Sequence, residues 1–164
     1  TVITVRMEVK KLDKLSFDLK LWKNHTLRQS LLGALLLAPI ILIFEEQNLL
    51  IVASLGSTIF VVLAIPSSKS ARARNVLLGH FIGLSVGSLS SLIPIAIIPA
   101  VIAVGVTMLL MIITKTAHAP ATGTALALSG SAIIPFELAS GFLIVLVLIA
   151  IIHHLGKPYF RDLV

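Results

Sequence analysis

The sequence predicts an all-α fold: a polytopic transmembrane bundle of about six spans. Hydrophobic side chains make up 57% of the 164 residues and charged ones only 12%, and the mean hydropathy is +1.08. One soluble core could not bury so much apolar surface. From residue 27 onward, short polar stretches divide the chain into apolar runs, and basic residues collect at the ends of these runs.

Each run can be compared with the roughly 20 residues that cross about 30 Å of hydrocarbon. The second and fifth are short for a full span. Both contain a stretch of small and polar residues, at 53–58 and 119–124, which predicts two short interrupted helices. The six runs are 27–44, 49–65, 75–93, 95–114, 120–134 and 138–155.

The distribution of charge predicts the orientation, because cytoplasmic loops retain Lys and Arg. With the amino terminus inside, six crossings return every basic loop to the cytoplasmic side and leave the acids outside. A five-span alternative with a re-entrant fifth segment puts Lys157 and Arg161 outside. The basic loop residues are Lys69, Arg72, Arg74, Lys115, Lys157 and Arg161, and the acids are Glu45, Glu46 and Glu137.

Three parts follow from this division: an amphipathic cytoplasmic segment (1–26), the transmembrane domain (27–156) and a cytoplasmic tail (157–164). Segment 1–26 lies either on an anionic membrane surface or against its own protein. Six spans also divide into three plus three, with an interrupted helix second in each half. That arrangement is typical of an inverted repeat with a binding site near the membrane midplane.

Interrupted helices leave backbone groups that lipid cannot satisfy, so we expect a polar interior where they meet. Pro120 suits a first helical turn, whose amides and dipole would face an anion near His118. His80 is an ionisable residue inside the third run, which makes it a functional candidate. His118 lies between Lys115 and the predicted helix start, in an electropositive pocket that could pair with an anion or with His80. The alternative is that the small residues only allow close packing and the imidazoles are neutral structural groups. The candidate substrate-binding residues are Ser54, Gly56, Ser57, Thr58, Arg74, Asn75, His80, Lys115, His118, Pro120, Thr122, Gly123 and Thr124.

Glycines recur every four residues in the third run, at Gly79, Gly83 and Gly87. This spacing forms one smooth stripe on a helix and predicts close contact with a neighbouring helix.

The sequence offers little for catalysis, metal binding or nucleic-acid binding. The predicted spans contain no carboxylate to orient a histidine and no acid pair, so we expect no catalytic site. His80 and His118 alone would leave zinc without further ligands, and there are no cysteines, so we expect no metal and no cofactor. Membrane orientation accounts for the net charge of +6 better than nucleic-acid binding does.

Three stretches together resemble the HPP family of integral membrane proteins: ASLGS (53–57), the segment from Pro66 to RNVLLGH (74–80), and TAHAPATGTAL (116–126). Order and spacing both match over roughly 27–156. The namesake His-Pro-Pro reads His118-Ala119-Pro120 here, so the rigidity of the first proline is lost. The family is usually described with about four spans, and some members are associated with nitrite transport. The resemblance therefore implies transport of a small anion.

We expect a transporter or channel for a small anion such as nitrite, through a midplane site formed by the interrupted helices. Its partners would be the lipid bilayer, the anion and a second copy in a dimer. The expected location is the cell inner membrane, with both termini cytoplasmic. A non-transporting membrane scaffold or sensor is the main alternative, and a histidine-centred membrane enzyme is a weaker one.

Overall fold

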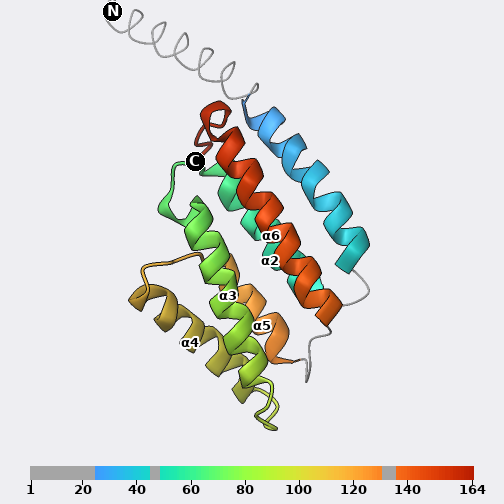
Figure 1. Cartoon of the computed structure of the whole chain (residues 1–164), viewed down its shortest axis with the longest axis vertical. Coiled ribbons are helices and arrows are strands. Elements are labelled where there is room, and N and C mark those ends of the chain that lie inside the picture. The colour runs from blue at the N-terminus through green and yellow to red at the C-terminus, as the bar shows by residue number, and fades with distance from the viewer. Residues whose placement is uncertain (1–24, 45–48, 131–135) are drawn as a thin grey trace, which may run out of the picture.

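The computed structural model describes residues 25–44, 49–130 and 136–164, the side chains of 136 and 137 excepted. These ranges contain six α-helices and no strand (Figure 1). The predictions for 1–24 and for the acids at 45, 46 and 137 lie outside the described structure. The helices are His25–Phe44, α2 (Leu49–Ala64), α3 (Ala73–Ser90), α4 (Ile98–Ile113), α5 (Pro120–Ser129) and α6 (Phe136–Gly156), and the 3₁₀ turns are η1 (Lys69–Ala71) and η2 (Lys157–Tyr159).

The predicted interruption of the second run is wrong. Helix α2 is continuous through 53–58. Its hydroxyls bond back to the preceding turn, Ser57 Oγ to the Ala53 carbonyl oxygen at 2.9 Å and Thr58 Oγ1 to that of Ser54 at 3.0 Å. Such bonds satisfy a polar side chain without breaking the helix.

The fifth run is short, as predicted, but its break precedes the helix. Helix α5 has 10 regular residues beginning at Pro120, or about 15 Å, half of a hydrocarbon core. The chain before it, residues 115–119, is irregular and contains the buried side chains of Thr116 and His118.

Helices α2, α3 and α5 meet near Pro120, where the irregular stretch passes into α5. Helix α5 packs against α2, α3 and α4, and α6 packs against α2 and α3. In Figure 1 the His25–Phe44 helix lies on the far side of the α2–α6 pair from α4. The apolar core lies mainly between α2 and α6, around Leu55, Val62, Phe142 and Leu146. The α2–α3–α5 contact contains a group of buried polar side chains.

Gly79, Gly83 and Gly87 form the predicted close contact with a neighbouring helix. A Cβ on Gly79 would lie 3.0 Å from the Cβ of His118, and one on Gly87 would lie 2.6 Å from the carbonyl oxygen of Ala125. One on Gly83 would overlap the carbonyl oxygen of Ala121. The three glycines therefore bring α3 against the 116–128 segment at backbone distance.

Two helices are long and apolar enough to cross a bilayer, His25–Phe44 and Leu138–Tyr159, while α2 and α4 are shorter apolar helices. Large apolar side chains also lie exposed along several helices, among them Leu42, Leu78, Leu109 and Leu148. Such an outer surface suits lipid better than water. The six crossings and the inverted repeat remain predictions.

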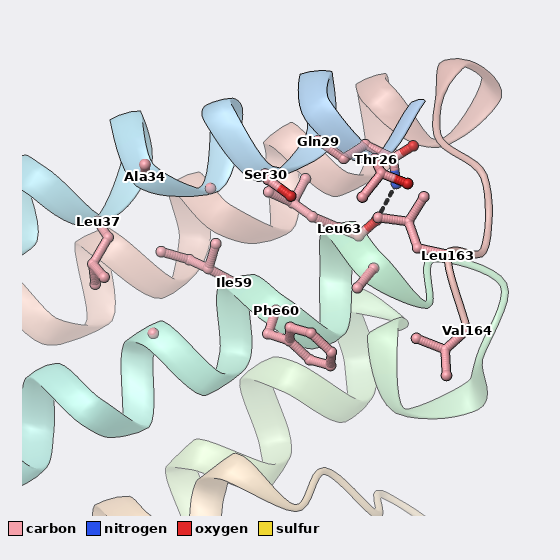
Figure 2. A pocket seen from close by; sticks show the side chains of 13 residues that line it. Thr26, Gln29, Ser30, Ala34, Leu37, Ile59, Phe60, Leu63, Leu163 and Val164 are labelled. Atoms are coloured by element: carbon pink, nitrogen blue, oxygen red, sulfur yellow. Dashed lines mark hydrogen bonds between the residues drawn. The ribbon is translucent and has the colours of Figure 1, made fainter. Parts of the chain in front are cut away.

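The carboxyl-terminal tail is held across the end of α2. Gln29, which is buried, donates through Nε2 to the carbonyl oxygens of Leu63 and Arg161, and its Oε1 accepts from the Arg161 N–H at 3.2 Å. The Leu163 N–H donates to the Ala64 carbonyl oxygen at 2.7 Å. Figure 2 shows the hollow between the His25–Phe44 helix and α2. Gln29 lies at one end of it, and Leu163 and Val164 line the same end.

Replacing Gln29 by methionine should free this tail. The substitution keeps the side-chain length but leaves the buried Leu63 carbonyl without its side-chain donor, a loss that typically costs about 1–3 kcal/mol, and removes both bonds to the Arg161 backbone. We expect faster tryptic loss of the residues after Arg161, measured by intact mass, and no change for Ser30→Ala in the same hollow. Equal rates in both variants would contradict this account of the tail.

Candidate functional site

A cluster of hydroxyl and imidazole side chains lies at the α2–α3–α5 contact. Thr58, His80, His118 and Thr124 have no exposed surface, and Ser54 is 3% exposed. These five residues, all predicted as site residues, are here called the histidine cluster. The structure brings them together from four parts of the chain: α2, α3, the 115–119 connection and α5.

Local structure explains why they meet. Ser54 and Thr58 are four residues apart in α2 and therefore share a face. Gly79 and Gly83 flank His80 in sequence and bring α3 close enough for its imidazole to reach both α2 and α5. The predicted pairing of the two histidines is present, with ring centroids 5.0 Å apart.

Hydrogen bonds link the cluster into one chain of contacts. Ser54 Oγ donates to the Pro120 carbonyl oxygen at 2.7 Å and lies 2.8 Å from Thr124 Oγ1. Thr124 Oγ1 is 2.8 Å from His80 Nδ1. Thr58 Oγ1 lies between the two rings, 2.8 Å from His80 Nε2 and 3.2 Å from His118 Nε2.

The other end of the chain is a backbone carbonyl of η1. His118 Nδ1 is 2.9 Å from the Ser70 carbonyl oxygen, with Ser70 Oγ 3.3 Å away. Nothing in the sequence singled out Ser70, because this contact depends on how the 65–72 turn folds back. Phe142, whose ring lies 5.4 Å from that of His80, was also missed.

A surface hollow of about 480 Å³ lies beside the cluster, between α2 and the start of α5. It unites the two small-residue stretches that the sequence singled out. Ser57 Oγ and Thr122 Oγ1 both donate to backbone carbonyls of their own helix turns. The polar side chains in its lining are Ser54, Ser57 and Thr122, and Pro120 and Gly123 complete the α5 side.

Four predicted site residues lie elsewhere. Gly56 lines the hollow of Figure 2 and meets Leu37 on the opposite face of α2. Arg74 and Asn75 hold the connection before α5, through bonds to the carbonyl oxygens of Thr114 (3.3 Å) and Ala117 (3.2 Å). Lys115 follows the end of α4 in the left-handed conformation, with φ 57°, and is exposed.

The electrostatics of the cluster favour neutral imidazoles. Burial lowers the pKa of His118, in the connection before α5, to about 4, against a smaller opposing contribution from the Ser70 carbonyl. No group of three or more His, Cys, Asp or Glu side chains that could hold a metal occurs in the described ranges. The chemistry available here is hydrogen bonding and proton transfer.

One comparison with known proteins is positive. The family model described as HPP, transmembrane region, matches residues 20–159. No curated protein and no solved structure matches the chain. The match covers most of the chain, includes all the helices of the histidine cluster, and agrees with the resemblance found in the sequence. The chain therefore belongs to the HPP family of membrane proteins.

Proposed function

We propose that the chain is a transporter or channel for a small anion such as nitrite, which passes along the α2–α5 face. The observation that carries this proposal is a hollow with three hydroxyls, from Ser54, Ser57 and Thr122, in a mostly apolar lining, beside a fully buried imidazole cluster. A small anion that sheds part of its water needs several hydrogen-bond donors, and three hydroxyls lie together in this hollow.

The donors are close together in the hollow. The hydroxyls of Ser54, Ser57 and Thr122 each donate to a backbone carbonyl, and a hydroxyl can rotate to give its hydrogen to an anion instead. The first turn of α5 adds the positive end of a helix dipole. Arg74 and Lys115, at the connection before α5, supply positive potential to attract an anion.

The same proposal includes the arrangement in the membrane. Six crossings with both termini in the cytoplasm keep Lys69, Arg72 and Lys115 on one side. An inverted repeat would relate α2 and α5, the two helices that line the hollow, as in transporters with a midplane site. We further propose residence in the cell inner membrane and a dimer.

Flux into proteoliposomes tests the proposal. Nitrite, nitrate, formate and chloride are compared, and Ser57→Leu should reduce the flux of the favoured ion by about tenfold or more, because its side chain fills the hollow and removes a donor, together worth ~1.4 kcal/mol or more. Ser85→Leu is the matched control: Ser85 is also exposed and bonds back to the Phe81 carbonyl oxygen at 2.9 Å. Its flux should equal that of the wild type.

Flux no greater than in empty vesicles for all four ions would contradict the proposal. It would favour a scaffold or sensor, a function compatible with a cluster whose hydroxyls and imidazoles all have partners. Equal loss of flux in both serine variants would also count against the hollow as the route.

A further inference from the structure

The direction of the hydrogen bonds in the histidine cluster follows from its two ends, since a carbonyl oxygen can only accept. Ser54 gives its one hydrogen to the Pro120 carbonyl oxygen, so Thr124 must donate to Ser54. Thr124 then has no hydrogen left, and His80 Nδ1 donates to it. At the other end, His118 Nδ1 donates to the Ser70 carbonyl oxygen.

The centre of the chain is therefore one hydrogen short. With both rings neutral and protonated on Nδ1, both Nε2 atoms are acceptors, and both face Thr58 Oγ1. Thr58 has one hydrogen, for which the Ser54 carbonyl oxygen, 3.0 Å away, also competes. One added proton completes the line of contacts from Pro120 to Ser70 when Thr58 gives its hydrogen to an imidazole and releases the Ser54 carbonyl oxygen.

We propose that His80, Thr58 and His118 form a proton-binding relay, which takes up one proton and shares it between the two imidazoles through the Thr58 hydroxyl. When His80 Nε2 carries the proton, it donates to Thr58 Oγ1, and Thr58 donates to His118 Nε2. Moving both hydrogens along the same line transfers the charge to His118. The transfer breaks one N–H and one O–H bond and forms one O–H and one N–H bond, so the number of protons is unchanged.

The surroundings limit the relay to a single proton. Two imidazolium rings with centroids 5.0 Å apart would repel each other in a buried site. Within the described structure, the packed elements present Thr58 and Ser54 from α2, Thr124 from α5, Ser70 from η1 and Phe142 from α6, none of which titrates near neutrality. Helix α4, which packs on α3 and α5, has no titratable side chain. The cationic residues nearest along the chain are exposed: Lys69, Arg72, Arg74 and Lys115.

Solid-state ¹⁵N NMR of histidine-labelled protein in bilayers tests the relay. Each histidine follows a different residue, so selective carbonyl labelling of the preceding residue type assigns all five without a substitution; the pairs are Asn24-His25, Gly79-His80, Ala117-His118, Ile152-His153 and His153-His154. At neutral pH both cluster rings should carry hydrogen on Nδ1. On acidification they should respond together, at one shared midpoint, with uptake of one proton.

Thr58→Val, which replaces the hydroxyl by a methyl group of similar size, should abolish the shared response. It should also lower the midpoint by about one to two pH units, because the protonated imidazole, a charged group, loses a hydrogen bond. Thr58→Ser should restore both. Thr107→Val is the control, because Thr107 is equally buried and its hydroxyl has no hydrogen-bond partner among the described residues. This variant should match the wild type.

Separate midpoints in the wild type, an Nε2–H tautomer on either ring at neutral pH, or an unchanged response in Thr58→Val would each overturn the relay. These readouts need no anion. Coupling of the proton to anion uptake rests on the proposed function. A protein that shares a proton between the two imidazoles but shows no anion flux would contradict the transport proposal and still support the relay.

Discussion

Gly87→Ala is expected to destabilise the protein, although the same change usually stabilises a helix. The new Cβ would lie 2.6 Å from the Ala125 carbonyl oxygen and 2.9 Å from the Leu128 Cβ. Both are parts of α5 that cannot rotate away, so α3 and α5 must separate. Overpacking of this kind costs about 1–3 kcal/mol, and the separation would also stretch the His80–Thr124 contact.

Gly105→Ala is the matched comparison. Gly105 also lies inside an apolar helix, α4, but apart from the adjacent residues and backbone of its own helix, a Cβ there would have no atom of the described structure within 4 Å. The substitution should be neutral or stabilising by up to about 1 kcal/mol, through helix propensity alone. Thermal unfolding in one detergent measures both variants. Changes of the same sign at Gly87 and Gly105 would contradict the close α3–α5 packing.

The second large effect is expected at Thr124, whose hydroxyl joins Ser54 to His80. Thr124→Val keeps the side-chain shape but leaves the His80 Nδ1 donor without an acceptor and Ser54 Oγ without its donor, in a site with no exposed surface. An unsatisfied buried group typically costs about 1–3 kcal/mol. We expect the melting temperature to fall accordingly.

Thr124→Ser should recover most of this loss because it retains the hydroxyl. Thr107→Val should be neutral or stabilising, since it removes a buried hydroxyl with no hydrogen-bond partner in the part of the chain that the structure describes. If Thr124→Val and Thr107→Val melt alike, the hydroxyl at 124 contributes nothing to the cluster.

Local spacing predicted the features that depend on one helix at a time. The six apolar runs correspond to six helices, and the four-residue spacing of Gly79, Gly83 and Gly87 correctly indicated a close helix contact. His80 was recognised because an ionisable residue is costly at membrane depth, and His118 because it lies near Lys115 and the start of a predicted helix. The sequence suggests that the two histidines pair, but it does not show that both Nε2 atoms contact the Thr58 hydroxyl.

The misplacement of Gly56 has a simple physical cause. The stretch 53–58 was interpreted as a break, in which every residue could face a common site. In the continuous helix α2, Gly56 lies two residues from both Ser54 and Thr58, and residues two apart point to nearly opposite sides. Gly56 consequently meets Leu37, while Ser54 and Thr58 meet α3 and α5.

The contribution of Ser70 was beyond sequence reasoning for a different reason. Its carbonyl is a backbone group, which carries no sequence signal, and the contact with His118 spans 48 residues. Predicting it requires the path of the turn between α2 and α3.

The absence of cysteine from the sequence allows the hollow between α2 and α5 to be tested directly. Ser57→Cys and Ser85→Cys each introduce one thiol at an exposed helical position, and each can be treated in proteoliposomes with a charged, water-soluble thiol reagent. A water-filled hollow predicts that the thiol at 57 reacts, that a small permeant anion slows the reaction, and that the thiol at 85 does not react. Failure of the thiol at 57 to react would mean that lipid occupies the hollow and that no anion passes there.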